Sequence, residues 1–387
     1  MKRIYSIDLI RGLVMLIMAI DHTRDLLHVS SLTEDPTNLA TTSVGLFMTR
    51  WITHLCAPTF VFLSGVSAYL SYKSHNNHSE SRRFLLTRGI WLVVLEFTIV
   101  SFGIWFDILF RTFLFQVIAA IGFGFIILSF LLRFSPKTLG VIGLIIVFGH
   151  NALSAIPLDN VPVLKAIVNF LFSFSFIPIT AKTSLIINYP IMPWLGIMLA
   201  GFGFGQIFEF DEAKRKSILL KVGFGSLLLF VIIRFTNLYG DTALWSSQKN
   251  AVFTILSFIN LTKYPPSLLY TLATLGVTIT LMGLTEGINN NTTKVISTYG
   301  KVPLFYYIIH WYIIHLIMLG MVFLQGFKWD ELNFGTFGFG RPQSGSGVQL
   351  PTVYLIWFIV ILILYPLCKW YAKYKSEHRD NKLLRYL

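Results

Sequence analysis

Long apolar runs, separated by short polar or basic loops, dominate the chain. Ten of them are about 20 residues long or slightly more, enough for a helix to cross the ~30 Å hydrocarbon core of a bilayer. They fall near residues 5–27, 45–72, 86–106, 110–132, 138–156, 187–208, 217–236, 266–285, 300–324 and 351–370. The pattern predicts an all-α, polytopic membrane helix bundle that forms one domain over residues 1–387.

The loops between these runs predict the orientation of the chain. Basic residues are concentrated in loops 73–88 and 209–216 and in the tail 371–387. Basic loops stay on the cytoplasmic side, and all three segments share one side if both chain ends are cytoplasmic. The stretch 160–180 has two interpretations. An interfacial or re-entrant segment on the outer face keeps this arrangement, whereas an eleventh span breaks it.

Composition supports a membrane protein and argues against a nucleic-acid partner. Charged residues make up 13% of the chain and hydrophobic residues 55%; a soluble domain carries about 25% charge. The net charge of +13 comes from short loops and the tail, which is the positive-inside pattern. The expected partner is therefore the lipid bilayer. The Gly/Ser/Pro-rich stretch 334–351 predicts a weakly ordered outer loop.

The first apolar run is unusual because charged side chains interrupt it near both ends. Asp8 and Arg11 lie near its start, and Asp21, His22 and Asp25 lie near its end. At ~1.5 Å and ~100° per residue, Arg11 and His22 are about 16 Å apart on nearly the same face. Ionised groups in hydrocarbon cost several kcal/mol. A cation and an imidazole on one stripe therefore indicate a site that runs through the membrane.

With both chain ends cytoplasmic, polar side chains of other runs gather at the level of His22. They are Arg50, His54, Glu96, Gln116, His150, Asn151, Tyr189, Trp194, Lys263, Tyr264, His310 and His315. Polar residues at one depth mark a site or a water-filled cavity. Structural alternatives stay open: Arg50 and Glu96 as a buried ion pair, and Lys263 as an interfacial anchor. No spacing typical of a zinc site supports a metal, so none is expected.

Several motifs resemble the transmembrane acyltransferase superfamily. Ser6-Ile-Asp8-x-x-Arg11-Gly12, followed by an apolar run to Asp21-His22, is similar to the opening helix of these enzymes. Further stretches resemble the bacterial membrane family grouped with the catalytic domain of heparan-α-glucosaminide N-acetyltransferase. They are Arg50-Trp-Ile-Thr-His54 through Gly65, Tyr189-Pro-Ile-Met-Pro-Trp194, Lys263-Tyr-Pro-Pro-Ser-Leu-Leu, Gly300 through His310 and Leu364-Tyr-Pro-Leu-Cys-Lys-Trp370.

The resemblance implies an enzyme of the bacterial inner membrane that takes an acyl group, such as acetyl, from cytoplasmic acyl-CoA. The acceptor would be a sugar amine or hydroxyl on the far side, and a homodimer is compatible with this interpretation. The resemblance also implies an essential histidine near the outer end of the first helix. The spacing from Asp8 matches His22; His54 and His28 are the alternatives.

A mechanism consistent with these residues assigns a role to each. His22 would act as general base, oriented by Asp25, while His54 or His310 polarises the thioester carbonyl; a covalent acetyl-histidine is the alternative. CoA phosphates would bind guanidinium groups, and the candidates are Arg11, Arg82, Arg83 and Arg88. Candidates for acceptor binding are Asp21, Arg50, Glu96, His150, Trp194 and Lys263.

Two other classes of protein fit part of the pattern. Polar residues at one depth on several helices are also typical of a proton-coupled transporter of polar solutes. However, the sequence contains no inverted repeat and no matching pair of Gly/Pro-broken helices that would favour this class. A structural scaffold would leave the many intramembrane ionisable residues without a purpose.

Overall fold

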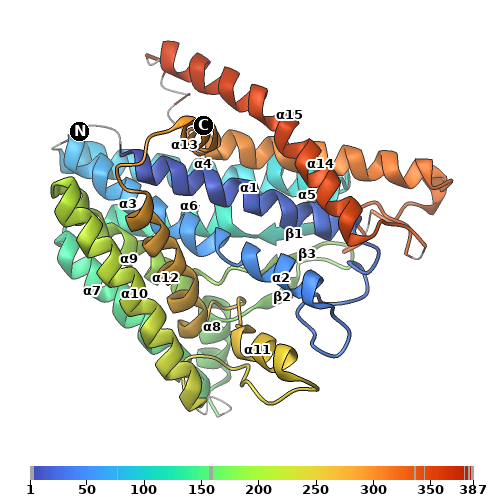
Figure 1. The fold of residues 1–387 in the computed structure, drawn as a ribbon, viewed down its shortest axis with the longest axis horizontal. Helices are drawn as coiled ribbons and strands as arrows, with labels where there is room; N and C mark the ends of the chain where they lie inside the picture. The colour runs from blue at the N-terminus through green and yellow to red at the C-terminus, as the bar shows by residue number, and fades with distance from the viewer. Residues whose placement is uncertain are drawn as a thin grey trace.

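A computed structural model describes residues 4–75, 77–156, 160–334, 337–343, 345–378, 380, 381 and 384. The described chain is mostly α-helical, with one small sheet (Figure 1). The helices are α1 (Tyr5–Leu27), α2 (Val44–Thr53), α3 (Cys56–His75), α4 (His78–Leu95), α5 (Ser101–Trp105), α6 (Val117–Leu131), α7 (Pro136–Gly149), α8 (Pro162–Phe172), α9 (Ile191–Phe204), α10 (Glu212–Thr236), α11 (Ala251–Ile259), α12 (Leu268–Thr285), α13 (Asn291–Gly300), α14 (Pro303–Leu324) and α15 (Leu350–Glu377). A π-helical turn, Glu96–Val100, joins α4 to α5.

The prediction of an all-α fold is wrong in one respect, because three short strands form a sheet. They are β1 (Thr112–Phe115), β2 (Ser175–Pro178) and β3 (Ser184–Ile187), in the order β1-β3-β2. β1 is parallel to β3, with Phe115 opposite Ile187, and β2 is antiparallel to β3. Each strand has four residues and lies close to a long apolar helix or segment. At a window of about 20 residues such a strand cannot be distinguished from the neighbouring span.

Eight helical segments of the described chain are long and apolar enough to cross a membrane. They are Val44–His75, His78–Trp105, Pro136–Leu153, Ile191–Glu209, Glu212–Thr236, Leu268–Thr285, Pro303–Leu324 and Leu350–Glu377. Of the other two predicted spans, α1 has 23 residues but several charges, and α6 has 15 residues. The stretch 160–180 contains α8, which at 11 residues is too short to cross a bilayer.

Helix α1 lies in the middle of the bundle. Figure 1 shows it between α3 on one side and α14 and α15 on the other, while α7, α9, α10 and α12 form a separate layer. Most of its residues are buried, including Asp8, Asp21 and Arg24. Its charged side chains therefore face protein rather than lipid, which explains how such a helix can lie within an apolar bundle.

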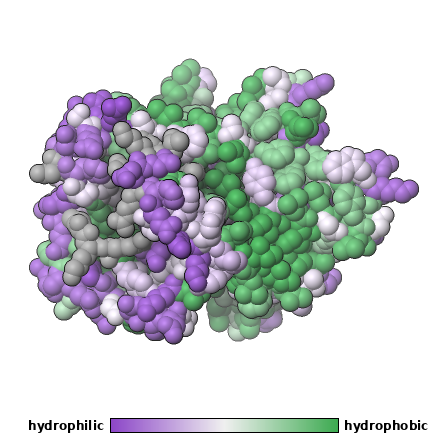
Figure 2. Space-filling view, turned by 90° about the horizontal axis from the view of Figure 1, so that it is seen from above, coloured by the Kyte–Doolittle hydropathy of each residue, from purple (hydrophilic) through white to green (hydrophobic). Residues whose placement is uncertain are grey.

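The surface of the protein is the kind that faces lipid. Figure 2 shows a broad hydrophobic band, with hydrophilic residues gathered at one end and a smaller hydrophilic tip opposite. On α15 the exposed apolar side chains include Leu355, Phe358, Ile359, Leu362 and Ile363. An exposed apolar surface of this extent is unfavourable in water. The protein is an integral membrane protein.

The predicted basic segments meet at the end of the molecule where α1 begins. Lys375 lines the same cavity as Arg11 and Arg88. Arg215 donates to Glu286 (Nε to Oε1, 3.0 Å), and Glu286 accepts from the hydroxyl of Ser6 at 2.7 Å. Loop 73–88, loop 209–216 and the start of the tail thus share one end, here called the basic end. Arg379, Lys382 and Arg385 of the tail lie outside the described residues.

Close helix packing at this end predicts a sensitive glycine. A Cβ on Gly12 of α1 would lie 2.0 Å from the carbonyl oxygen of Ile296 in α13. We expect Gly12→Ala to destabilise the protein by about 1–3 kcal/mol, because the two backbones must separate. Gly225→Ala in α10 is the matched control, since a Cβ there meets nothing within 4 Å. Thermal unfolding in detergent measures both; equal melting temperatures for the two variants would contradict the expectation.

Candidate active site

A cavity of about 170 Å³ lies at the end of α1 opposite to the basic end. We call it the His22 cavity. Met18, Asp21, His22 and Asp25 of α1 line it, successive residues of one helix face. Its other polar lining residues include Arg50, Thr53, Gln116, Asn188, Tyr189, Lys263, Tyr264 and Tyr307. The structure therefore brings residues from α1, α2 and three later segments to one place.

His22 is held by aromatic side chains of α14. Its ring centroid lies 3.9 Å from the ring of Trp311 and 5.2 Å from that of His310. The imidazole is partly exposed to the cavity. Its Nδ1 is buried without a hydrogen-bond partner in the described structure. The ring is thus fixed by packing while one edge faces the cavity, as a general base requires.

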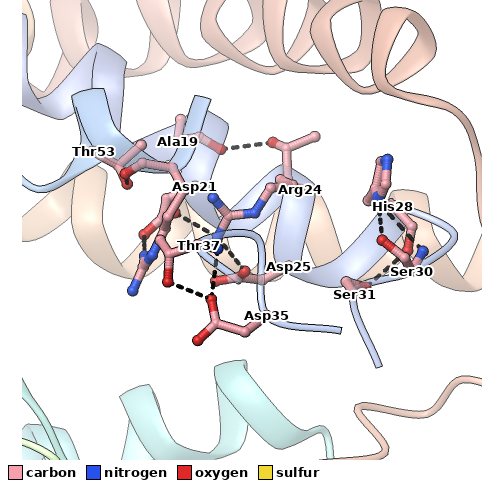
Figure 3. Close-up of polar contacts among 12 residues, drawn as sticks. Ala19, Asp21, Arg24, Asp25, His28, Ser30, Ser31, Asp35, Thr37 and Thr53 are labelled. Atoms are coloured by element: carbon pink, nitrogen blue, oxygen red, sulfur yellow. Dashed lines mark hydrogen bonds and ion pairs between the residues drawn. The ribbon is translucent and has the colours of Figure 1, made fainter. Parts of the chain in front are cut away.

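An ion-pair network includes Asp21, the residue before His22, together with Arg24 and Asp25 (Figure 3). Asp21 contacts two guanidinium groups: Oδ1 lies 2.7 Å from Nη2 of Arg24, and Oδ2 lies 2.6 Å from Nη1 of Arg50. Arg24 also contacts Asp25 at 2.5 Å. Asp21 and Arg24 are three residues apart on α1, so this pair lies within one helical turn. Arg50 pairs with Asp21 and not with Glu96, so the predicted Arg50–Glu96 pair is wrong.

Asp25 lines the cavity but its carboxylate contacts Arg24, not His22. Within the described residues no hydrogen bond joins Asp25 to the imidazole. The orienting role expected for Asp25 therefore has no direct contact to support it. The ring of His22 is oriented by Trp311 instead, which is a residue that the sequence interpretation did not select.

Two side-chain amides at the edge of the small sheet line the His22 cavity. Gln116 follows β1 directly and Asn188 follows β3 directly, and both line the His22 cavity. Because β1 and β3 are parallel, their carboxyl ends lie at the same edge of the sheet. The backbone N–H of Asn188 donates to the carbonyl of Phe115 at 3.2 Å, which continues the ladder up to the site. These amides offer hydrogen bonds to a polar acceptor.

Lys263 and Tyr264 form a further wall of the cavity. Lys263 is buried, and its ammonium lies 5.2 Å from the centroid of the Tyr264 ring. Burial raises the pKa of the Tyr264 phenol, but the nearby cations Lys263 and Arg50 outweigh this effect and leave that pKa below its usual value. Lys263 is thus part of the site and not merely an interfacial anchor.

The loop after α14 contributes Phe337 and Phe339 to the lining of the cavity. Arg341 of this loop donates to the carbonyls of Leu26 and His28, at 3.3 and 3.0 Å, just where α1 ends. These are backbone acceptors that a helix terminus leaves unsatisfied. Burial lowers the pKa of Arg341 to about 10, so it stays charged at neutral pH. In this loop Phe339 stacks on Trp105 at 4.8 Å, and both line the cavity. Arg341 and Phe339, which belong to the described part of the predicted loop 334–351, thus have defined contacts with the bundle.

A second cavity of about 340 Å³ opens at the basic end, and we call it the Arg11 cavity. Four basic residues line it: Arg11, Arg88, Lys301 and Lys375. Arg11 donates to the hydroxyl of Ser67 at 2.9 Å and lies 3.6 Å from Asp8. The rest of the lining is largely apolar, with Met15, Phe84, Leu85 and Leu92 among the contributors. Such a site suits a ligand with an anionic head and an apolar arm.

Two of the four arginines predicted to bind CoA lie elsewhere. Arg82 lines a separate surface cleft with Arg133, and its guanidinium lies over the ring of Phe130 at 5.0 Å. Arg83 is exposed and lines neither of the two cavities. On a helix, residues six apart point in different directions, which separates Arg82 from Arg88. The Arg11 cavity is lined instead by Lys301 and Lys375, which the sequence interpretation did not select.

Several other predicted site residues also lie outside the His22 cavity. His54 packs edge-on to Tyr270, with 5.4 Å between ring centroids, and Trp194 is buried against Tyr189. His310 lies behind His22, and its Nδ1 is 2.5 Å from the carbonyl of Tyr307. His150 lies 3.0 Å from the carbonyl of Pro266, through Nε2.

Glu96 and His28 have local structural contacts. The Glu96 carboxylate accepts from the backbone N–H of Ala119 at 2.8 Å and so caps the first turn of α6. His28 lies just past the end of α1, where its Nδ1 contacts the hydroxyl of Ser30 at 3.1 Å. Burial and the nearby Arg24 and Arg341 lower its pKa. Of the three candidate histidines, His22 is the one that lines the cavity.

No group of three or more metal-ligating side chains gathers anywhere in the described chain. The two cavities are lined by an imidazole, an ion-pair network, amides and a set of cations. These groups suit acyl transfer between a charged donor and a polar acceptor.

Comparison with known proteins places this site in a family. No curated protein matches the chain. The family model described as "Heparan-alpha-glucosaminide N-acetyltransferase, catalytic" matches residues 3–245, well over half of the chain. The match includes α1 with His22 and ends before Lys263, Tyr307 and Trp311. The chain belongs to the family of the heparan-α-glucosaminide N-acetyltransferase catalytic domain, and it is a membrane protein of the acetyltransferase type.

Proposed function

We propose that this protein transfers an acyl group from acyl-CoA, bound in the Arg11 cavity, to a sugar amine or hydroxyl bound in the His22 cavity. One observation carries the proposal. Arg11 and Met15 line one cavity, and Met18, His22 and Asp25, farther along the same face of α1, line the other. A donor and an acceptor that enter from opposite ends would meet along this face.

The Arg11 cavity fits the donor. Arg11, Arg88, Lys301 and Lys375 supply positive charge for the phosphates of CoA, and charged hydrogen bonds to phosphate are strong. The pantetheine arm would then follow α1 toward His22, a rise of ~16 Å over 11 residues. Acetyl-CoA is the donor that the family match favours.

In the transfer step His22 would take a proton from the acceptor amine or hydroxyl as that atom attacks the thioester carbonyl carbon. A tetrahedral intermediate forms, and its collapse breaks the C–S bond. The CoA thiolate leaves and takes up the proton from the His22 imidazolium, so that acyl product and free CoA result. Gln116, Asn188 and Lys263 would hold the acceptor in place.

The proposal includes a topology and a location. Both chain ends lie in the cytoplasm in this scheme, with α1 and α6 completing ten spans, since basic segments favour the cytoplasmic side. The membrane would be a bacterial inner membrane, and the acceptor would lie on its outer side. A homodimer is part of the same proposal. Fusions of a reporter enzyme to loops at the two ends test the orientation.

The proposed acyl-CoA site in the Arg11 cavity predicts that loss of its arginines weakens acetyl-CoA binding. We expect Arg11→Ala and Arg88→Ala to weaken acetyl-CoA binding by about tenfold or more each, because a hydrogen bond to a charged group contributes about 1.5–3 kcal/mol. Binding to the purified protein in detergent measures this, and Lys216→Ala at the exposed basic loop is the control. Equal affinities for all three variants would contradict the donor site. Failure of the wild type to bind any acyl-CoA would favour the transporter class instead.

A further inference from the structure

The two cavities share a wall that is one side chain thick. Phe60 of α3, Val117 at the start of α6 and Tyr307 of α14 each line both the His22 cavity and the Arg11 cavity. All three are buried, with exposed fractions of 9%, 6% and 2%. Any group that passes from one cavity to the other must therefore displace or slide past these three side chains.

The wall lies at the level where the acyl group would be transferred. On α14, Tyr307 is one turn from Trp311, whose ring contacts His22. On α3, Cys56 and Ala57, one turn before Phe60, line the His22 cavity, and Ser64, one turn after, lines the Arg11 cavity. A donor that reaches from the basic end toward His22 meets this wall first.

The Tyr307 hydroxyl has a free hydrogen-bonding capacity at this wall. It is buried; the Trp311 indole N–H lies near the phenol oxygen, outside ordinary hydrogen-bond geometry, and the phenol O–H has no acceptor in the described structure. By contrast, the Tyr270 hydroxyl donates to the His54 carbonyl at 2.9 Å. A buried unpaired hydroxyl costs about 1–3 kcal/mol. The Tyr306 hydroxyl is also unpaired, but Tyr307 lines both cavities, where a ligand can supply the partner.

From this geometry we propose that Phe60 and Tyr307 form an acyl gate between the two cavities. The Tyr307 hydroxyl donates a hydrogen bond to the thioester carbonyl oxygen, and Phe60 restricts the acyl chain to short groups. This inference rests on the proposed function and deepens it. As the acceptor attacks, the carbonyl oxygen gains negative charge, and the Tyr307 hydroxyl stabilises it until the C–S bond breaks.

The relative size of the cavities supports selection for short acyl groups. The His22 cavity, at about 170 Å³, is smaller than the Arg11 cavity, at about 340 Å³. The smaller cavity must hold the acyl group together with the reacting part of the acceptor. A long acyl chain would have to remain below the wall, where Phe60 keeps its carbonyl away from His22.

The test compares acetyl-, butyryl- and octanoyl-CoA with purified full-length protein in detergent. It measures the dissociation constant of each donor and the rate of CoA thiol release. Phe60→Ala is expected to raise octanoyl relative to acetyl turnover at least tenfold, and Phe60→Leu to raise it less. Phe62→Ala is the matched control, because Phe62 lies on the same helix as Phe60 but packs on Phe204 of α9 and lines neither cavity.

A separate experiment tests the role of the Tyr307 hydroxyl. Tyr307→Phe is expected to lower kcat about 10²–10³-fold, the usual loss for one oxyanion donor, with the acetyl-CoA dissociation constant unchanged. Tyr306→Phe is the matched control, since that hydroxyl is equally buried and unpaired but lines neither cavity. The gate is overturned if the Phe60 variants keep the wild-type preference for chain length, or if Tyr307→Phe matches Tyr306→Phe. Normal donor binding in those variants would leave the proposed function standing. A wild type that binds no acyl-CoA would overturn both.

Discussion

Replacing His22 by glutamine is expected to reduce acyl transfer by about 10²–10⁴-fold, the usual contribution of a general base. Glutamine keeps a polar side chain of similar length, so the packing against Trp311 changes little. The dissociation constant of acetyl-CoA should stay at the wild-type value, because the donor phosphates bind near Arg11 in the other cavity. Release of free CoA from acetyl-CoA, followed beside a binding titration, measures the two quantities independently.

Three variants sharpen the comparison. His378→Gln is the control, because His378 is exposed near the end of α15. His54→Gln and His310→Gln test the alternative roles, and we expect each to lose less activity than His22→Gln. Full activity of His22→Gln, together with a large loss in His54→Gln, would move the general base to His54. Incubation with radiolabelled acetyl-CoA separates the two mechanisms at His22, since a stable acetyl label on wild-type protein alone would indicate a covalent intermediate.

The central feature of the site could be predicted from the sequence because it depends on one helix. The spacing of Arg11 and His22 fixes their relative direction and depth once α1 is assigned, and each of them lines its own cavity on one face. The Asp21–Arg24 pair is likewise local, three residues apart. Helical periodicity is therefore sufficient for features within one element.

Features that depend on the rotation of one helix about its axis could not be predicted. Depth places Arg50 and Glu96 at one level, yet Glu96 caps the first turn of α6 while Arg50 reaches Asp21. Which side chain faces which neighbour is decided by packing between helices, and periodicity within one apolar span does not encode it. For the same reason the sequence did not show that Arg88 lines the Arg11 cavity while Arg82 lines a different cleft.

Asn188 was missed, and Gln116 was placed at the level of His22 by depth alone, for a different reason. Each follows a strand of four residues: β1 lies inside the run 110–132 that was assigned to a helix, and β3 ends where the run 187–208 begins. The signal available was weak: Thr112–Phe115 and Ser184–Ile187 contain mostly aromatic and branched residues, and a polar amide ends each of them. A site at the carboxyl ends of two parallel strands would follow once both strands are recognised, but their pairing spans some 70 residues of chain.

The second large effect concerns stability, and Asp21→Asn is expected to cost about 3–5 kcal/mol of unfolding free energy. The Asp21 carboxylate is shared by the Arg24 and Arg50 guanidinium groups, and its side chain is 8% exposed. Asparagine has nearly the same shape but no charge. The substitution therefore leaves two buried cations close together, with Asp25 as the remaining carboxylate beside Arg24.

The stability of Asp25→Asn shows whether the loss in Asp21→Asn comes from the buried ion pairs. The Asp25 side chain is 40% exposed, so its contact with Arg24 is screened by solvent and contributes at most about 1 kcal/mol. The double variant Asp21→Asn/Arg50→Gln removes one of the two uncompensated cations and should recover part of the lost stability, which a double-mutant cycle measures as coupling. Unfolding in mixed micelles of increasing dodecyl sulfate content gives the free energies. Equal losses in Asp21→Asn and Asp25→Asn, with no coupling to Arg50, would show that the network contributes nothing to stability. A large, coupled loss would mean that the charges beside His22 also hold α1 against α2, so that the site is built from the same contacts that stabilise the bundle.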